Sequence, residues 1–174
     1  MRPRFPSIRI RSPRWPRGWR AALPLTAVAL AATALFFTPL TSASADSTLL
    51  SRGKPATASS SENTTVYPAS AAVDGDQNTR WSSAFADPQW LQVDLGATAT
   101  IDRVVLTWEA AYGTSFQIQV SPDASAWTPV YTTTGTGGTQ TLAVTGSGRY
   151  VRLTGTQRGT TYGYSLWEMG VYRQ

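Results

Sequence analysis

The chain has 174 residues, with 15 basic and 10 acidic side chains and neither cysteine nor histidine. The lack of cysteine excludes disulfides and thiolate metal sites, and the lack of histidine excludes the Ser-His-Asp triad and the commonest general base. The formal charge of +5 is uneven: seven arginines lie within residues 1–20, whereas residues 46–174 hold eight bases and ten acids, a net charge of −2. A basic groove for nucleic acid is therefore not expected in the folded part.

The first 45 residues have the organisation of a secretory signal peptide. An arginine-rich segment precedes an apolar run over residues 21–40, and Ala43 and Ala45 then occupy the small-x-small positions of a cleavage site. We expect residues 1–45 to be removed and residues 46–174 to form one secreted, extracellular domain with no remaining membrane segment. A retained signal anchor is the alternative, although Pro24 and Pro39 interrupt the roughly 20 apolar residues that a spanning helix needs.

Residues 46–174 combine few charges with many threonines and aromatic side chains, a composition that suits β-strands. Alternating apolar and polar residues predict strands at 90–95, 101–108, 116–120, 127–131, 139–144, 150–153 and 166–172. Turn signals separate several of these strands, at residues 94–96, 121–123, 135–138 and 146–148. Short strands at this spacing predict an all-β antiparallel sandwich or jelly roll.

Four segments, in this order, resemble the factor five/eight type C, or discoidin, domain: residues 71–81 (AAVDGDQNTRW), 87–95 (DPQWLQVDL), 101–109 (IDRVVLTWE) and 163–168 (GYSLWE). Among its branches the sequence is most similar to bacterial carbohydrate-binding module family 32, as attached to chitosanases and β-1,3-glucanases. The resemblance implies an eight-stranded antiparallel jelly-roll β-sandwich of the galactose-binding type, with binding loops at one end. It also implies a non-catalytic monomer that works alone or beside an appended or separate glycoside hydrolase.

A calcium site is the first chemical expectation. The turn at residues 74–79 places oxygen ligands around a glycine, as a hard cation requires, although the spacing is not that of an EF-hand. The resemblance implies a structural Ca²⁺ held by Ala71, Asp74, Asp76, Thr79, Trp167 and Glu168. The alternative is that Asp74 and Asp76 only cap a turn.

A sugar site is the second expectation, because sugars are held by aromatic faces and by paired polar groups in shallow loop platforms. The resemblance places Glu62, Arg80, Glu109 and one of two late tyrosines, Tyr162 and Tyr164, in the pocket. Phe85 and Tyr112, from neighbouring loops, complete the candidate ligand-binding residues. Two carboxylates would suit the protonated amine of glucosamine.

Each of these residues also has a structural interpretation. Arg80 could form a scaffold ion pair with Glu109, and Tyr162 and Tyr164 share one face of an extended segment, so that one binds while the other packs. Four tryptophans in strand-like contexts are expected in the core rather than on a platform: Trp81, Trp90, Trp108 and Trp167.

The expected function is binding of a β-linked polysaccharide, with chitosan or another glucosamine-containing chain first and β-1,3-glucan second. One alternative is cell-surface adhesion or lipid binding, which would need exposed apolar side chains with basic neighbours. The other is a small glycosidase that uses Glu62 and Glu109 as an acid/base pair.

Overall fold

The computed structural model describes residues 47–174, so the expected signal peptide lies outside the described residues. The described part is almost entirely β-structure and contains one short 3₁₀ helix, η1 (Ala69–Ala72). The strands are β1 (Thr48–Leu49), β2 (Ala56–Ala58), β3 (Trp81–Ser82), β4 (Gln89–Trp108), β5 (Gly113–Ser121), β6 (Thr128–Thr134), β7 (Thr139–Arg158) and β8 (Ser165–Arg173). The expectation of an eight-stranded antiparallel β-sandwich is confirmed.

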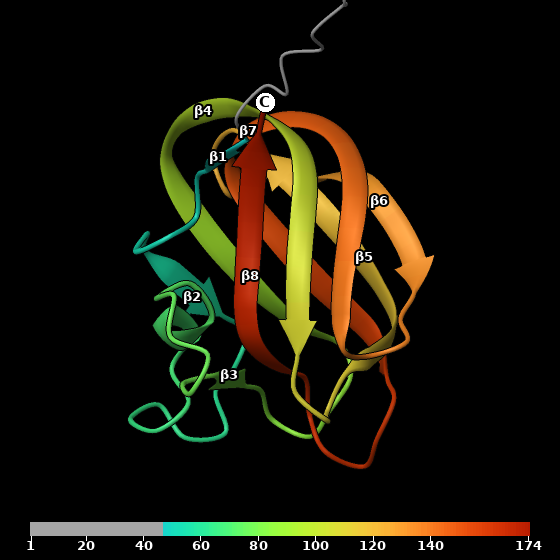
Figure 1. Ribbon diagram of the computed structural model, residues 1–174. Coiled ribbons are helices and arrows are strands. Elements are labelled where there is room, and N and C mark those ends of the chain that lie inside the picture. The colour runs from blue at the N-terminus through green and yellow to red at the C-terminus, as the bar shows by residue number, and fades with distance from the viewer. Residues whose placement is uncertain (1–46) are drawn as a thin grey trace, which may run out of the picture. The chain divides into compact units, whose positions relative to one another are not determined.

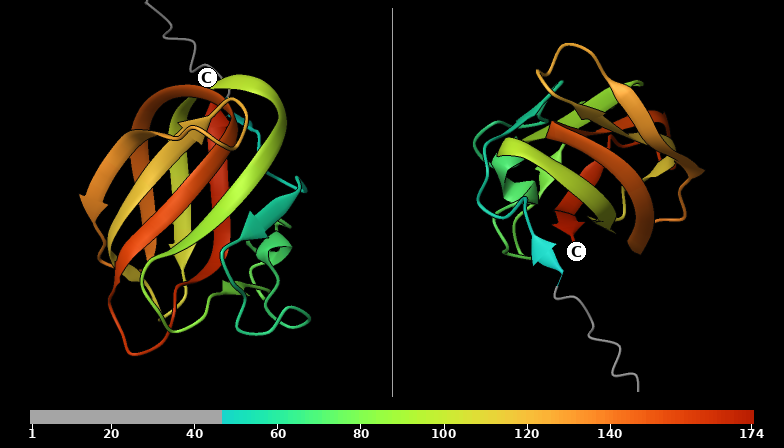
Figure 2. Two further views of the ribbon diagram at one scale, coloured as in Figure 1. Left: turned by 180° about the vertical axis from the view of Figure 1, so that it is seen from behind. Right: turned by 90° about the horizontal axis from the view of Figure 1, so that it is seen from above.

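Two packed layers share the long strands β4 and β7, which pair with each other along most of their length. One layer consists of β1, β8, the second half of β4 and the first half of β7, and it faces the viewer in Figure 1. The other consists of β2, the first half of β4, the second half of β7, β5 and β6, and Figure 2 shows it from behind. Every pairing between these strands is antiparallel.

Two of the four predicted turns are bends inside continuous strands, which corrects the expectation of separate short strands. Residues 94–96 lie within β4, where Gly96 has φ +86° and the register with β7 shifts, and residues 146–148 lie within β7. Both strands bend at the same level, because Ala99 pairs with Gly148 and Ile101 with Gly146. The pairing of β4 with β7 therefore continues on both sides of the bend, as it does at β-bulges. The predicted turns at 121–123 and 135–138 do separate strands.

The core lies between the two layers and consists of the inward residues of the predicted alternation. The first half of β4 supplies three inward residues to one layer, Leu91, Val93 and Leu95. The second half of β4 supplies three to the other layer, Val104, Leu106 and Trp108, and β5 supplies Phe116, Ile118 and Val120. Of the four tryptophans expected in the core, Trp81 and Trp108 are buried. Trp90 and Trp167 are half-buried, and the Trp90 ring stacks 4.5 Å from the guanidinium of Arg152.

Long connections gather at the end of the sandwich opposite the bends of β4 and β7, at the bottom of Figure 1. They are residues 59–80, the segment 83–88, the β4–β5 connection 109–112 and the β7–β8 connection 159–164. Loops at one end of a rigid β-sandwich are a common place for a binding site.

Within residues 47–174, no helix has the length and apolar character needed to cross a membrane.

Candidate functional site

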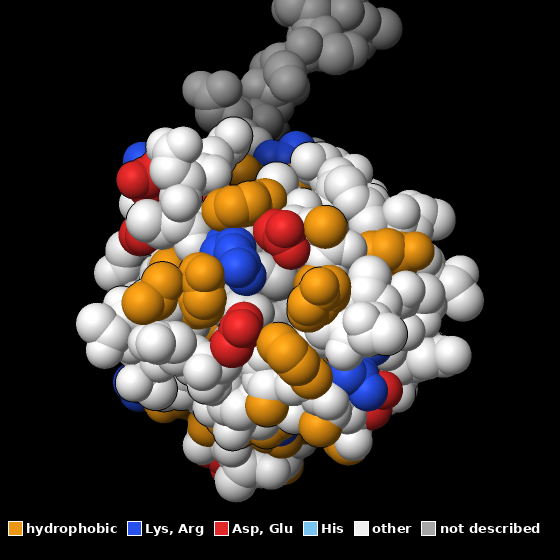
Figure 3. Space-filling model, turned by 90° about the horizontal axis from the view of Figure 1, so that it is seen from below, with side chains coloured by type: hydrophobic (Ala, Val, Ile, Leu, Met, Phe, Trp, Pro, Cys, Tyr) orange, Lys and Arg blue, Asp and Glu red, His pale blue; other side chains and the backbone are white. Residues whose placement is uncertain are grey.

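A cavity of about 400 Å³ opens at this end of the sandwich and is called the loop-end pocket below. It is lined by Glu62, Arg80, Ser82, Glu109, Ala110, Ala111, Thr160 and Tyr162. Figure 3 views this end and shows a basic side chain between two acidic ones, with hydrophobic side chains around them. The fold therefore brings together Glu62, Arg80, Glu109 and Tyr162, four of the predicted ligand-binding residues that lie up to 100 positions apart in the chain.

Arg80 is half-buried and is held by an aromatic ring and a hydroxyl group. Its guanidinium carbon lies 4.0 Å from the centre of the Tyr67 ring, and its Nη1 donates to Ser165 Oγ at 2.7 Å. The two ion pairs within residues 47–174 are Arg149–Asp94 and Arg158–Asp87, so Arg80 pairs with neither carboxylate of the pocket. The alternative of a scaffold ion pair between Arg80 and Glu109 is therefore wrong.

The two carboxylates are oriented by neighbouring hydrogen bonds. Glu62 Oε2 accepts from Ser82 Oγ at 2.9 Å, and the Glu62 N–H donates to the Ser82 carbonyl at 2.7 Å. Glu109 Oε2 accepts from the Ala111 N–H at 3.0 Å. Each of these carboxylates uses one oxygen in these bonds, which leaves acceptor capacity for a ligand.

Ser165, the first residue of β8, connects Arg80 to the Glu109 loop. Its buried hydroxyl accepts from Arg80 and donates to the Trp81 carbonyl at 3.1 Å. Its backbone carbonyl accepts from the Glu109 N–H at 3.0 Å, and its own N–H donates to the Ala111 carbonyl at 2.7 Å. One buried residue thus determines the position of the guanidinium relative to the loop that carries one of the carboxylates.

An exposed aromatic pair, called the aromatic rim below, lies beside the pocket: Tyr162 lines the pocket, and Phe85, which is not among the lining residues, contacts Tyr162. Phe85 is 48% exposed and Tyr162 is 62% exposed, and their rings meet edge to face with centroids 5.7 Å apart. Tyr164, the other predicted tyrosine, is only 1% exposed and lies in the core, where its hydroxyl donates to Asp87. Burial, together with that bond, raises the pKa of Tyr164. The prediction of Tyr164 as a ligand contact is therefore wrong. Of the two tyrosines, Tyr164 is the one that packs in the core.

Tyr112 also lies outside the loop-end pocket, although the sequence predicted it as a ligand-binding residue. Its ring packs against glycines of two neighbouring segments: a Cβ at Gly159 would lie 2.8 Å from the ring, and one at Gly137 would lie 3.1 Å from it. Tyr112 is half-buried there and acts as a spacer between loops.

Six residues of the site or its support were not predicted: Tyr67, Ser82, Ala110, Ala111, Thr160 and Ser165. Small hydroxyl residues are abundant in the chain, so nothing in their local sequence marks these ones. Tyr67 lies 13 positions before Arg80, and only the path of the loop brings its ring under the guanidinium.

The expected calcium turn shows oxygen atoms close together. Thr79 Oγ1 lies 2.8 Å from Asp74 Oδ2 and 3.0 Å from the Asp76 carbonyl oxygen, within hydrogen-bond distance of both, so three of the expected ligand oxygens cluster. Both carboxylates also cap the turn, as the alternative interpretation holds: Asp74 Oδ1 accepts from the Asp76 N–H, and Asp76 Oδ1 accepts from Asn78. The Asn78 bonds lower the pKa of Asp76.

The environment of Glu168 on β8 tests whether the residues expected to bind Ca²⁺ would fit the ion. Its Oε1 is buried and has no hydrogen-bond partner. Burial raises the pKa of Glu168, and the negative charges of Asp74 and Asp76 raise it further. Within residues 47–174, no three acidic side chains lie close enough together to hold a metal ion by themselves. The expected shell instead combines carboxylate, hydroxyl and carbonyl oxygens, which is the donor set that Ca²⁺ prefers.

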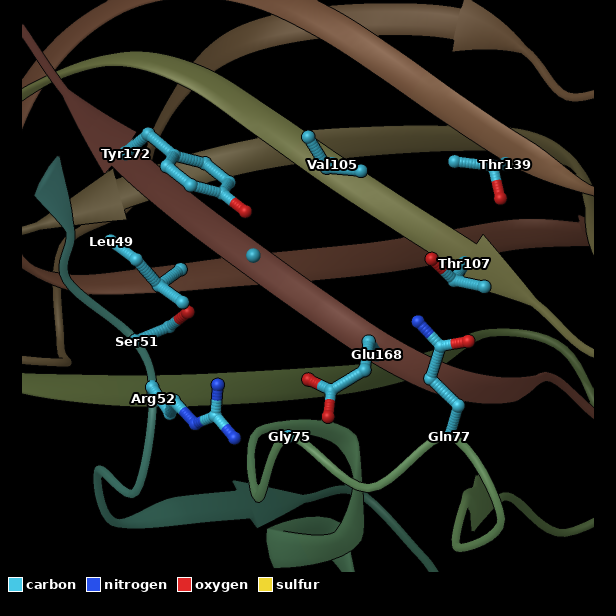
Figure 4. Close-up of a pocket in the computed structure, with 11 residues that line it drawn as sticks. Leu49, Ser51, Arg52, Gly75, Gln77, Val105, Thr107, Thr139, Glu168 and Tyr172 are labelled. Atoms are coloured by element: carbon cyan, nitrogen blue, oxygen red, sulfur yellow. The ribbon is translucent and has the colours of Figure 1, made fainter. Parts of the chain in front are cut away.

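A second cavity of about 400 Å³ lies on the outer face of the β8 layer, away from the loop-end pocket. Figure 4 shows Glu168 and Arg52 projecting into it beside Gly75, with Tyr172 and Leu49 at its other end. Arg52 packs on Gly75, because a Cβ at that glycine would lie 2.3 Å from the guanidinium. This cavity adjoins the calcium turn, and the sequence did not predict it.

The comparisons with known proteins agree with one another on a family. The model of the F5/8 type C domain matches residues 55–169. Chitosan-binding module 1 from a chitosanase/glucanase of Paenibacillus sp. IK-5 is 51% identical, with a TM-score of 0.69, and the match covers 72% of this chain and 99% of that one. Chitosan-binding module 2 of the same enzyme, solved in complex with chitotriose, is 44% identical, with a TM-score of 0.68 and coverage of 71% and 99%.

Two further similarities are more distant or shorter. The family 32 CBM from Clostridium perfringens NanJ, solved in complex with galactose, is 25% identical with a TM-score of 0.64, and the match covers 73% of this chain and 99% of that one. A polysaccharide lyase 8 family protein, HylA of Enterococcus faecalis, is 42% identical over 60 residues, which are 34% of this chain. The chain matches only 4% of the length of that lyase.

Proposed function

The chain belongs to the F5/8 type C domain family, and from that premise we propose that it is a non-catalytic carbohydrate-binding module for a glucosamine-containing β-linked polysaccharide such as chitosan. β-1,3-Glucan is the second ligand to test. The observation that carries the proposal is the loop-end pocket, where Arg80 lies between loops that carry Glu62 and Glu109 without pairing with either carboxylate. The modules at 51% and 44% identity are described as chitosan-binding, which supports the same ligand class.

The pocket has complementary groups for an amino sugar. The two carboxylates can accept charge-assisted hydrogen bonds from a protonated amine, and the planar fork of Arg80 can donate to neighbouring hydroxyls. Tyr162 and Phe85 offer aromatic surface to the C–H face of the sugar. Two acids and one base give the pocket a net negative charge, which does not suit the anionic lipid surface that the adhesion alternative requires.

We also propose that a structural Ca²⁺ binds at the turn of residues 74–79. Asp74, Thr79 and Glu168 would hold it through side chains, with the carbonyls of Ala71, Asp76 and Trp167. The support is the cluster of oxygens around Thr79 and the buried, unpartnered Glu168 Oε1. The ion would offset the charges of the Asp74 and Glu168 carboxylates and make the segment that ends at Arg80 rigid.

The module would act outside the cell after removal of residues 1–45, beside an enzyme that degrades the polysaccharide. The support is the origin of the similar modules in a chitosanase/glucanase and the partial match to a polysaccharide lyase. In this scheme the module keeps the substrate near the enzyme and cleaves nothing.

The ligand is tested by isothermal titration of chitosan oligosaccharides, N-acetylated chitin oligosaccharides and β-1,3-glucan oligosaccharides into the protein. We expect the chitosan series to bind most tightly. Substituting Glu62→Gln or Glu109→Gln removes a charged acceptor and should weaken chitosan binding by about tenfold each, or about 1.4 kcal/mol. Asp102→Asn, at the opposite end of the sandwich, is the control and should bind normally.

Three outcomes contradict parts of this proposal. Unchanged chitosan affinity in both Gln variants would exclude the acidic pocket as the amine site. Stronger binding of β-1,3-glucan, unaffected by Glu109→Gln, would replace the ligand. Release of reducing sugar over several hours would instead favour the glycosidase alternative, in which Glu62 and Glu109 act on the glycosidic bond.

A further inference from the structure

Arg158, the last residue of β7, contacts both loops that carry the aromatic rim. Its Nε donates to Asp87 Oδ2 at 3.2 Å, which links it to the loop that contains Phe85. Its Nη1 donates to the carbonyls of Thr161 and Tyr162, each at 3.3 Å, which links it to the β7–β8 connection. The Arg158 and Asp87 side chains are 24% and 34% exposed, so the pair is partly shielded from water.

Asp87 is also attached to the core of the sandwich. Its Oδ1 accepts from the hydroxyl of Tyr164, whose ring is buried. The Tyr164 ring packs directly on Gly155 of β7, because a Cβ there would lie 2.2 Å from the ring. Asp87 therefore joins a fixed point of the core to Arg158.

These contacts determine the spacing of the rim. Phe85 and Tyr162 are both largely exposed, so burial in the core does not hold their rings in place. Their edge-to-face contact, with centroids 5.7 Å apart, depends on where the two loop backbones lie. Two hydrogen bonds between Ser83 and Tyr164 join the bases of the two loops, and the Asp87–Arg158 pair is the connection that reaches the Tyr162 carbonyl.

We propose that Asp87 and Arg158 are positioning residues that hold the aromatic rim and thereby govern the preference of the module for longer chains. This inference rests on the proposed function. Glu62, Arg80 and Glu109 are held by Ser82, Tyr67, Ser165 and Ala111, and none of these contacts involves Asp87 or Arg158. A single sugar in the pocket would therefore sense the pair only through Tyr162, which lines the pocket, whereas a longer chain that also reached Phe85 would sense it through both rings.

The test uses the variants Arg158→Gln and Asp87→Asn, with Arg149→Gln as the matched control. Asn at position 87 keeps an acceptor for Tyr164 and loses the charge that pairs with Arg158. The control breaks the other ion pair, Arg149–Asp94, at the far end of the sandwich. Affinities for glucosamine and for chitotriose are measured by titration, and the contact between the Phe85 and Tyr162 rings is measured by NMR in the unliganded proteins.

We expect both test variants to lose the ring-to-ring contact and to bind chitotriose about tenfold more weakly, with glucosamine affinity within about twofold of the parent. The double variant should be no weaker than either single one, because both remove the same connection. Arg149→Gln should change neither measurement.

Equal weakening for glucosamine and chitotriose would overturn the inference, as would an unchanged ring contact or fully additive losses in the double variant. If the parent binds no chitosan oligosaccharide, the proposed ligand fails. The ring contact in the unliganded proteins then still decides whether the pair positions the rim.

Discussion

At the scale of single residues, the chemistry of the site was predictable and its support was not. Glu62, Arg80 and Glu109 stand out in a chain with few charges, and the resemblance assigned them to one pocket. Ser165 holds Arg80 and the Glu109 loop together, yet it is one of many serines in the sequence. Tyr162 and Tyr164 share an extended face, and only packing shows that Tyr164 fills the core.

Ser165→Ala is expected to weaken chitosan binding while the protein remains folded. The change removes the hydroxyl that accepts from Arg80 and should cost about 1 kcal/mol of binding free energy. Ser51→Ala is the control, because Ser51 is a buried serine with two hydrogen bonds at a distance from the pocket.

Titration with chitotriose and urea unfolding of both variants separate the two effects. Both should lose stability, and only Ser165→Ala should lose affinity. Equal affinities in the two variants would mean that the guanidinium needs no support from Ser165.

At the scale of elements, the strand positions were predicted well and their continuity was not. The alternation correctly placed the inward residues of β4 and β5. Glycines at 96, 146 and 148 were interpreted as turns because glycine is frequent there. A bend and a turn use the same residue type, and only the pairing of β4 with β7 distinguishes them.

The Asp94–Arg149 ion pair joins β4 to β7 at this bend and should make stability depend on pH. Two hydrogen bonds from Arg149 are the main reason why the pKa of Asp94 is lowered to about 2. A carboxylate with a lowered pKa stabilises the folded state above its unfolded pKa of about 4, and this contribution is lost as pH falls from about 4 to 2.

Urea midpoints of the parent and Arg149→Gln at several pH values measure this contribution. We expect the variant to have the lower midpoint at pH 6 and the two midpoints to converge near pH 2. A difference that persists unchanged at pH 2 would assign the effect to packing of the arginine stem on Tyr150 rather than to charge.

At the scale of the whole molecule, calcium is expected to stabilise the sandwich through the turn of residues 74–79. An ion that binds only the folded state adds about 2.7 kcal/mol of stability when present at a hundred times its dissociation constant. Thermal unfolding with calcium and with a chelator measures this gain. Asp74→Asn should abolish it, because the Asp74 carboxylate is an expected ligand.

Asp76→Ala separates ion binding from turn capping. Asp76 is expected to contribute its carbonyl, whereas its carboxylate only accepts from Asn78. This variant should therefore be less stable with or without the ion and still respond to calcium. A parent protein that melts at one temperature under both conditions would show that the turn is held by its own hydrogen bonds.

The sequence by itself determined the all-β class, the inward residues of the main strands and the polar groups offered to a ligand, because these depend on local alternation and on residue type. Only the tertiary structure decided which predicted residues meet: Glu62, Arg80, Glu109 and Tyr162 line one pocket, while Tyr112 and Tyr164 pack elsewhere. The physical reason is that a loop side chain points where distant backbone segments leave room for it. That room depends on contacts between residues far apart in the chain, which local pattern does not encode.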